Sequence, residues 1–562
     1  MAKGIPYNIA LKHYRAQAER PMPQTDFGEE LLRQYHPDYL RERCVDLTVG
    51  PNAGDPCHRQ LAEVLQGDAR IDEADLAGSP EVETDVLVIG GGGAGCAAAL
   101  EASLAGAKVI LATKLRLGDS NTVMAEGGIQ ASVEKDDTPQ QHYEDTVKGA
   151  HGELDRSLAA QMVMDAPEVI RWLIQQGMQF ELDQYGDLMT RRAGGTSAPR
   201  VLYFRDYTGL EMMRVLREAV FNSNIEVWDY SPAVELLSDE SGHCAGAVVS
   251  SLKDYKYILV KARSVIIATG GIGRMHLNDF PTSNHFGATG DGLVLAYRAG
   301  ARLRDLDIFQ YHPSGLAYPP HLAGTLITEG VRSAGAYLLN AAGERFIDEL
   351  KPRDYVAAAI IRECAEGRGV YAGDGQGRPS VAGGRTPGAT DGKCGVWLDT
   401  PSIELRQPGI IEKRFPKLLH LGTKCGIDPR KQPPLIYPTL HYQNGGAIID
   451  REAASTVPGL FCAGEVCGGV HGRNRLMGNS LLDIIVFGRR AGQAAAKRAH
   501  GFGRGPKKIT IEHLRNFRRE LMLANMPLAR KSPLLFPAYA KFDVDSDYDG
   551  LRKTAAAGFI ND

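Results

Sequence analysis

The chain has 562 residues, of which 43% are hydrophobic and 23% are charged, and this length predicts two or three domains in a soluble globular protein. The formal net charge of -4 gives no overall attraction to nucleic acid or anionic lipid. No apolar run of about 18 residues would span a membrane, and the N-terminus lacks an apolar signal core, so we expect a cytoplasmic protein.

Nine cysteines are dispersed along the chain. An odd, scattered set argues against a disulfide framework. No CxxC motif occurs, so neither a metal site nor an iron–sulfur site is expected within this chain. The neighbouring pair Cys462 and Cys467 is interpreted as two small buried apolar side chains.

The first 80 residues are polar and irregular, with short helices predicted around Glu29–Arg43 and Gln60–Leu65. Two interpretations of this region stand side by side. It is either an extension laid over the surface of the protein or a disordered tail.

A strand–turn–helix–strand unit follows. Asp85–Ile89 is a short apolar run typical of a buried parallel strand, a helix is predicted over Cys96–Ala102, and a second strand over Lys108–Ala112. The turn carries a G-x-G-x-x-G pattern at Gly90, Gly92 and Gly95. In this context the pattern predicts a tight turn, a close approach of backbone to a pyrophosphate, and a helix N-terminus that faces the phosphates.

The second strand ends in Thr113-Lys114 instead of the usual ribose-binding acid, which argues against a plain NAD site. Further strands are predicted over Ser264–Ala268 and Gly459–Ala463. Nucleotide-fold elements therefore occur at both ends of the chain, and the segment from about 300 to 437 is interpreted as an inserted domain. Within it, the glycine-rich loop Gly367–Gly395 is expected to be an exposed excursion.

Four further segments carry unusual chemistry. They are Phe309–Pro313 (FQYHP), Thr328–Arg332 (TEGVR), Pro352–Asp354 (PRD) and His471–Leu482 (HGRNRLMGNSLL). With the glycine-rich turn, these ordered motifs make residues 83–500 resemble the flavoprotein subunit of fumarate reductase and succinate dehydrogenase. L-aspartate oxidase and soluble flavin-dependent fumarate reductases are related to that family.

The resemblance implies an α/β fold with a Rossmann-like FAD-binding domain, an inserted α+β capping domain and a short C-terminal segment. The expected boundaries are 1–80 for the N-terminal extension, 81–300 and 437–500 for the FAD-binding domain, 301–436 for the capping domain and 501–562 for the C-terminal segment. Substrate is expected between the two domains.

The resemblance also implies a set of FAD contacts, and no metal ligand. Three glycines are expected at the pyrophosphate, two residues near the adenosine, and the others along the flavin. The set is Gly90, Gly92, Gly95, Thr113, Lys114, Ser120, Asn121, Thr122, Gly127, Gly128, Thr269, Gly270, Asp291, Glu465, Ser480 and Leu481.

Four residues are expected to bind a small dicarboxylate. By resemblance, His312 and Thr328 grip one carboxylate, twisted out of plane, and His441 and Arg475 grip the other. Arginine offers a charge-assisted fork to a carboxylate, and histidine adds a donor. Anchoring both ends would position the C=C bond over the flavin, and the twist would concentrate positive character on the carbon that receives hydride.

Arg353 matches the proton donor of the family, with Glu329 and Arg332 as the residues that feed it. An arginine has a solution pKa above about 12, so it can act only as a relay supplied from elsewhere. The i, i+3 spacing of Glu329 and Arg332 places both on one side of a helical turn. The alternative for Glu329 is a plain helix-cap carboxylate.

Two positions depart from the family. Members with covalent FAD attach it through a histidine in the run that here reads Asp119–Thr122, and Asn121 offers no nucleophilic nitrogen, so FAD is expected to be non-covalent and the chemistry to favour reduction. Ala193 stands where fumarate reductases carry phenylalanine and L-aspartate oxidases glutamate. It makes a larger pocket conceivable, unless Leu202 or Phe204 fills the space.

These observations predict an FAD-dependent enzyme that reduces fumarate or a close unsaturated dicarboxylate, with electrons from an iron–sulfur partner or a soluble carrier. The protein is therefore expected in the cytoplasm, either free or bound through its partner to the inner face of the membrane. L-aspartate oxidase stays an alternative, because the loop from His312 to Thr328 is close to the oxidase length. A second alternative is a non-catalytic FAD electron-transfer subunit. The proton relay of Arg353, Glu329 and Arg332 argues against it, because a subunit that only holds flavin needs no proton donor. Only about sixty residues follow Arg498, where larger family members carry a longer helical domain, so we expect a docking surface that differs from theirs.

Overall fold

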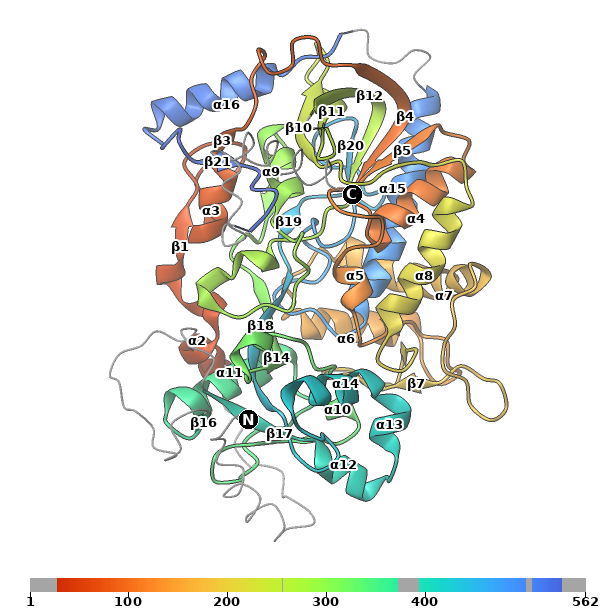
Figure 1. Cartoon of the computed structure of the whole chain (residues 1–562), viewed down its shortest axis with the longest axis vertical. Coiled ribbons are helices and arrows are strands. Elements are labelled where there is room, and N and C mark those ends of the chain that lie inside the picture. Colours follow the sequence, from red (N-terminus) through yellow and green to blue (C-terminus); the bar gives the residue numbers. More distant parts are fainter. Residues whose placement is uncertain (1–27, 255, 372–393, 502–507, 538–562) are drawn as a thin grey trace, which may run out of the picture.

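The computed structural model describes residues 28–254, 256–371, 394–501 and 508–537. Figure 1 shows two lobes. The upper, large-sheet lobe (residues 81–304 and 446–501) is built on a seven-stranded sheet, and the lower, small-sheet lobe (residues 309–443) on a five-stranded sheet. Most of the predicted loop Gly367–Gly395 lies outside the described residues.

The large sheet has the strand order β10-β11-β12-β4-β5-β9, with β20 paired to β12. Its strands are β4 (Glu81–Ile89), β5 (Val109–Ala112), β9 (Glu226–Trp228), β10 (Ala233–Ser238), β11 (Cys244–Ser251), β12 (Lys256–Ile267) and β20 (Leu460–Cys462). Strands β4, β5, β9, β12 and β20 pair in parallel, so their carboxyl ends meet at one edge. The predicted βαβ unit and the two later strands are thus confirmed.

Helices α4 (Gly93–Leu104) and α15 (Asn479–Gly501) pack on this sheet, and α9 (Asp291–Arg298) contacts β10. Further helices of this lobe pack on these helices or on one another: the short α5 (Asn121–Met124), α6 (Pro139–Gly149), α7 (Arg156–Gln175) and α8 (Thr208–Phe221). Helices α4 and α15 pack closely because glycine faces alanine, and a Cβ at Gly492 would lie 2.2 Å from the Ala98 carbonyl oxygen. A three-stranded sheet is formed by β6 (Ile129–Gln130), β8 (Val201–Leu202) and β7 (Thr190–Arg191).

The small-sheet lobe is antiparallel. Its strands are β14 (Phe309–Leu316), β15 (Tyr337–Leu339), β16 (Val370–Tyr371), β17 (Cys394–Asp399) and β18 (Leu435–Gln443), and its helices are α10 (Gly330–Ser333), α11 (Arg353–Ala365), α12 (Thr400–Arg406), α13 (Ile410–Arg414) and α14 (Pro416–Cys425). The two crossings between lobes pair with each other as β13 (Leu303–Arg304) and β19 (Gly446–Ala447). Strand β18 runs through position 437, where the sequence suggests a boundary.

Residues 28–80 form packed structure and not a tail. They contain α2 (Gly28–Tyr35), β1 (Cys44–Asp46), β2 (Pro56–His58), α3 (Arg59–Leu65) and β3 (Asp68–Ala69). Helix α2 packs on α11, and Leu32 and Leu61 are buried. Near the other end of the chain, β21 (Lys531–Ser532) pairs with β3, and α16 (Glu512–Leu523) packs beside it.

The cysteines are free, and seven of them are buried, including Cys462 and Cys467 as expected. Among the described helices, none is long and apolar enough to cross a membrane. In the same part of the chain, no group of three or more His, Cys, Asp or Glu side chains could hold a metal ion.

Candidate functional site

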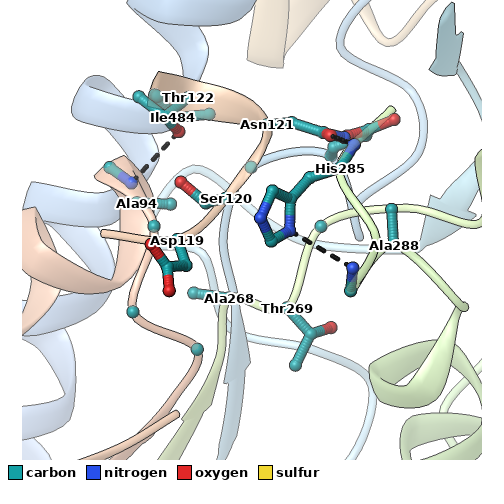
Figure 2. A pocket seen from close by; sticks show the side chains of 18 of the residues that line it. Ala94, Asp119, Ser120, Asn121, Thr122, Ala268, Thr269, His285, Ala288 and Ile484 are labelled. Carbon is teal, nitrogen blue, oxygen red and sulfur yellow. Dashed lines mark hydrogen bonds between the residues drawn. The ribbon is translucent and has the colours of Figure 1, made fainter. Parts of the chain in front are cut away.

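A large cavity opens at the carboxyl ends of the parallel strands. Its empty space, including the part open to solvent, is about 1340 Å³. It is lined by the residues that follow those strands: Gly90 after β4, Thr113 after β5, Thr269 after β12 and Glu465 after β20. In open α/β sheets this edge is where ligands bind. Figure 2 shows the wall formed by Ser120, Asn121 and Thr122 on one side and by Ala268 and Thr269 below.

The glycine-rich turn forms the narrow end of this cavity. Gly90 has a φ of +118°, and a Cβ there would lie 2.3 Å from the Ala268 carbonyl oxygen. A Cβ at Gly95 would lie 1.8 Å from the carbonyl oxygen of Gly90. Only glycine fits either position, so the chain turns tightly into α4. The first residues of α4 line the cavity, and its N-terminal N–H groups suit a pyrophosphate.

Polar side chains cover the wall near β5. Lys114 Nζ lies 2.6 Å from Asp291 Oδ2 and 2.8 Å from Thr289 Oγ1. No hydrogen-bond partner reaches the buried Oγ1 of Thr269 within the described part of the chain. This wall therefore pairs a lysine with a carboxylate and offers a free hydroxyl to a bound nucleotide.

Asn121 is fixed by three hydrogen bonds. Its Nδ2 donates to Asn284 Oδ1 (2.6 Å) and Glu465 Oε2 (3.1 Å), and its Oδ1 accepts from the His285 main-chain N–H (2.6 Å). The imidazole of His285 lines the cavity opposite Ser120 (Figure 2). Burial lowers the pKa of His285.

Thirteen of the sixteen predicted FAD contacts line this one cavity. Gly95, Gly127 and Gly128 do not. Gly95 packs helix on strand, Gly127 lies against Met477, and a Cβ at Gly128 would lie 2.4 Å from the Leu202 carbonyl oxygen. These three glycines pack against protein atoms, and their direct contact with FAD stays a prediction. The remaining lining fits an extended nucleotide with phosphates at α4.

A second group of predicted residues lies at the other end of the cavity, where the two lobes meet. His441 and Arg475 line the cavity, and the ring centroids of His312 and His441 are 5.0 Å apart. Arg353 begins α11 on the small-sheet lobe, and Arg475 precedes α15 on the large-sheet lobe. The fold thus brings together side chains from both lobes.

Gln310 joins these two arginines. Its Oε1 accepts from Arg353 Nη1 and from Arg475 Nη2, each at 2.9 Å. Its Nε2 donates to the Arg475 carbonyl oxygen at 2.7 Å. Sequence reasoning assigned no role to Gln310, although it lies in the FQYHP motif two residues before His312.

Glu329 lies between Arg353 and a third arginine, Arg332. Its Oε2 is 2.7 Å from Arg353 Nε and 3.3 Å from Arg332 Nη2, and its Oε1 accepts the Gly194 N–H at 2.8 Å. Burial alone would raise the pKa of Glu329, but the charges of Arg353 and Arg332 lower it to about 2. Its carboxylate forms no cap bond to α10, so the helix-cap alternative is wrong.

The two histidines are neutral. Burial and the neighbouring Arg353 hold the pKa of His312 well below its usual value, and burial and Arg475 do the same for His441. His312 Nδ1 accepts the Ser314 N–H at 3.1 Å, so the neutral ring carries its proton on Nε2. His441 Nδ1 lies 2.7 Å from Ser283 Oγ, which orients that ring.

The arginines carry more charge than the nearby carboxylate balances. Arg332, Arg353 and Arg475 against Glu329 leave a net charge of plus two in this cluster. Burial, followed by the nearby Arg353, lowers the pKa of Arg475 to about 9. Among the described residues, no partner reaches its buried Nε. A doubly charged anion would satisfy these groups.

Ala193 does not line the cavity. It is 1% exposed and forms a small cluster with Val201 and Met477, so these two side chains fill the space beside it. Leu202 and Phe204, the residues expected to fill that space, lie outside this cluster. Ala193 is connected to the site only by its chain neighbour Gly194, whose main-chain N–H donates to Glu329.

The fold and the cavity define an FAD-binding oxidoreductase, and comparison with known proteins agrees. Residues 85–481 match the family described as FAD binding domain. One subunit of the fumarate reductase (CoM/CoB) of Methanothermobacter marburgensis is 39% identical over 441 residues, 76% of this chain and 75% of its own. L-aspartate oxidase of Streptomyces coelicolor is 36% identical over 422 residues, 73% of this chain and 68% of its own.

Among solved structures, E. coli quinol fumarate reductase matches with a TM-score of 0.68 at 30% identity, covering 79% of this chain and 74% of that one. The chain therefore belongs to the FAD-binding family of fumarate reductase and succinate dehydrogenase flavoproteins and their relatives, as its motifs predict. Its cofactor is FAD, and its mixed α/β class is confirmed.

Proposed function

We propose that this protein reduces the C=C bond of fumarate or of a closely related unsaturated dicarboxylate. The observation that carries the proposal is the convergence of Arg353, Arg475, His312 and His441 around Gln310 at one end of the cavity. Arg353 and the two neutral histidines on the small-sheet lobe, with Arg475 on the large-sheet lobe, suit a small dianion held at both ends.

In this proposal the large-sheet lobe is an FAD-binding domain and the small-sheet lobe is an inserted α+β capping domain, with substrate between them. The boundary expected between 436 and 437 then moves to the end of β18 at Gln443. The finding that supports this division is the pairing of β13 with β19, which brings the two crossings of the chain together. His312, Thr328, Arg353 and His441 then belong to the capping domain, and Arg475 belongs to the FAD-binding domain. Both domains must approach each other for the site to be complete.

One carboxylate is assigned to His312 and Thr328, and the other to His441 and Arg475. The Nε2–H of neutral His312 is a donor, and Thr328 Oγ1, which accepts the Gly330 N–H at 3.2 Å, keeps its own proton to donate. Arg475 Nη1 and Nη2 are held by Ser480 and Gln310, which fixes its plane. Donors held in this way position both ends of the substrate before reaction.

FAD, when bound and reduced, supplies the hydride for one alkene carbon. Gly90, Gly92 and the α4 N-terminus would hold its pyrophosphate, and Lys114 and Asp291 would lie near its adenosine. The amide of Asn121 has no nucleophilic nitrogen, so FAD is held without a covalent bond.

Arg353 is assigned as the donor of the proton to the second alkene carbon. Glu329 and Gln310 bind its Nε and Nη1, so Nη2 is the nitrogen assigned to substrate. When Arg353 gives up its proton, Glu329 loses the neighbouring charge that does most to lower its pKa. Glu329 then becomes basic enough to pass a proton from Arg332 to Arg353.

Electrons must reach FAD from outside the chain, and we assign this task to an iron–sulfur partner or a soluble carrier. The support is twofold. The described residues hold no cluster of metal-binding side chains, and relatives carry names such as "8-methylmenaquinol:fumarate reductase flavoprotein subunit" of Wolinella succinogenes.

The test is oxidation of reduced viologen by the purified holoprotein with fumarate or methylfumarate, run beside oxygen-dependent oxidation of L-aspartate. We expect turnover with fumarate and none with L-aspartate. Turnover of L-aspartate alone would instead identify an oxidase. If the protein turns over neither a dicarboxylate nor L-aspartate, a non-catalytic FAD subunit is favoured.

A further inference from the structure

Thr328, one of the residues assigned to substrate, turns its main-chain N–H toward Glu126 of the opposite lobe. Glu126 follows α5 in the large-sheet lobe, and its side chain is 3% exposed. The main-chain N–H of Thr328 faces this carboxylate and stabilises its charged form. The position of Thr328 therefore depends on a side chain that lies about 200 residues earlier in the chain.

The same carboxylate is paired with a lysine of the small-sheet lobe. Lys417 Nζ, in the first turn of α14, lies 2.7 Å from Glu126 Oε1. A second large-sheet carboxylate, Asp206, accepts the main-chain N–H groups of Lys417 (3.0 Å) and Leu418 (3.3 Å). One helix of the small-sheet lobe is thus attached at its N-terminus by two acids of the other lobe.

We propose that Glu126 and Lys417 form an interlobe latch that positions Thr328 and so sets the affinity for the dicarboxylate. This inference rests on the proposed function, because it assigns Thr328 to substrate. Glu126 itself does not line the cavity, so it is a positioning residue. Its negative charge binds both the Thr328 main chain and the Lys417 ammonium, and both contacts weaken when the charge is lost.

The surroundings of Glu126 make the latch sensitive to pH. Burial raises the pKa of Glu126 to about 7, against the lowering effect of Lys417, and the nearby Asp206 raises it further. The other charged or titratable groups that face it are Tyr207 and Arg191, whose Nη2 donates to the Glu126 carbonyl oxygen. Above pH 7 the carboxylate is charged and the latch is closed. Below pH 7 it is neutral and the latch opens.

The experiment compares the wild-type holoenzyme with Glu126→Gln, Lys417→Met and the double variant. At pH 8 each single variant should raise the KM for fumarate about tenfold, with kcat changed much less, because a charge-assisted bond is lost without loss of the proton donor. The double variant should be no worse than either single one, since both act through one contact. Glu126→Asp should restore part of the affinity.

The pH profile separates a latch from a merely structural role. In the wild type, the KM for fumarate should rise as pH falls from 8 to 7, whereas in Glu126→Gln it should be high and independent of pH over this range. The range stays above pH 7 because burial raises the pKa of Asp206, the second acid bound to α14, to about 6. The control is Lys261→Met, which removes a pair of similar length within one lobe, Lys261 Nζ–Glu81 Oε2 at 2.6 Å. It should keep the wild-type profile.

Hydrogen exchange provides a readout that does not depend on turnover. Amides of residues 324–333 and of α14 should exchange faster in Glu126→Gln and Lys417→Met than in the wild type or Lys261→Met. Unchanged exchange together with an unchanged KM profile would overturn the latch. If the wild type turns over no dicarboxylate, the proposed function fails, and the exchange result alone decides whether the latch exists.

Discussion

Arg353 Nε lies 2.7 Å from Glu329 Oε2, and both side chains are almost fully buried. The two residues come from different elements, α11 and the residue before α10, and are 24 positions apart. A buried pair of this kind costs desolvation energy and is rarely the most stable choice for a protein core. The pair is therefore better explained by proton transfer than by stability.

Substitution Arg353→Ala should remove catalysis while FAD binding and folding persist. The side chain contacts Glu329 and Gln310, and Gln310 joins it to Arg475, which lines the cavity. A positioned proton donor contributes about 10²–10⁴-fold, so kcat should fall by at least about 10²-fold in the viologen assay. Arg353→Lys should not restore it, because lysine cannot bond Glu329 and Gln310 together.

The matched control is Arg406→Ala. Arg406 lies on α12 of the same lobe and donates to Gly335 and Tyr337. Its loss should leave kcat near the wild-type value. If Arg353→Ala retains turnover similar to that of Arg406→Ala, the proton donor is misassigned.

Substitution Gln310→Leu should lower kcat/KM although Gln310 donates no proton. Leucine has a similar volume but removes the oxygen that accepts from both Arg353 and Arg475. A hydrogen bond to a charged group is worth about 1.5–3 kcal/mol, so a loss of roughly 10–150-fold is expected. Gln310→Glu keeps the acceptor but adds a negative charge, which should raise the KM of a dianionic substrate. Wild-type kinetics in Gln310→Leu would rule out this positioning role.

FAD should be fully released when the protein is precipitated with acid. Asn121 occupies the position where covalent members carry histidine, and its amide is held by Asn284, Glu465 and the His285 N–H. After acid treatment, all flavin absorbance should appear in the supernatant. Fluorescent flavin that stays on the denatured chain would contradict this expectation.

Local motifs made most of the cofactor site predictable. Gly90 and Gly95 follow a strand and begin a helix, and this order alone defines a nucleotide turn. The contacts that sequence reasoning missed join distant segments. Asn121 and Asn284 are 163 positions apart, and Glu126 meets Lys417 across nearly 300 residues. No local period or spacing encodes such pairs, because tertiary packing alone brings them together.

Gly127 and Gly128 show what a motif position alone cannot predict. Their sequence position, next to the expected flavin, suggested direct contact. The structure places them against Met477 and the Leu202 carbonyl oxygen. A motif position indicates that glycine is needed, but not whether a ligand or the protein itself requires the space.

Substitution Ala193→Phe should destabilise the protein without changing substrate choice. A larger pocket was conceivable from the sequence, since fumarate reductases carry a ring there. Ala193 is 1% exposed, however, and Val201 and Met477 already fill its surroundings. The added phenyl ring would overpack this cluster at a cost of about 1–3 kcal/mol in the free energy of unfolding, measured by urea denaturation. It would also move the Gly194 N–H away from Glu329, so kcat should fall.

The ratio of kcat/KM for methylfumarate to that for fumarate should stay the same in Ala193→Phe and in the wild type, because the new ring would replace protein contacts and not substrate contacts. Ala193→Ser is the control, since it changes the volume little and should retain both stability and turnover. A methyl group in an apolar pocket is worth about 1–3 kcal/mol of discrimination. A drop of tenfold or more in the ratio for Ala193→Phe would show that position 193 lines the substrate pocket after all.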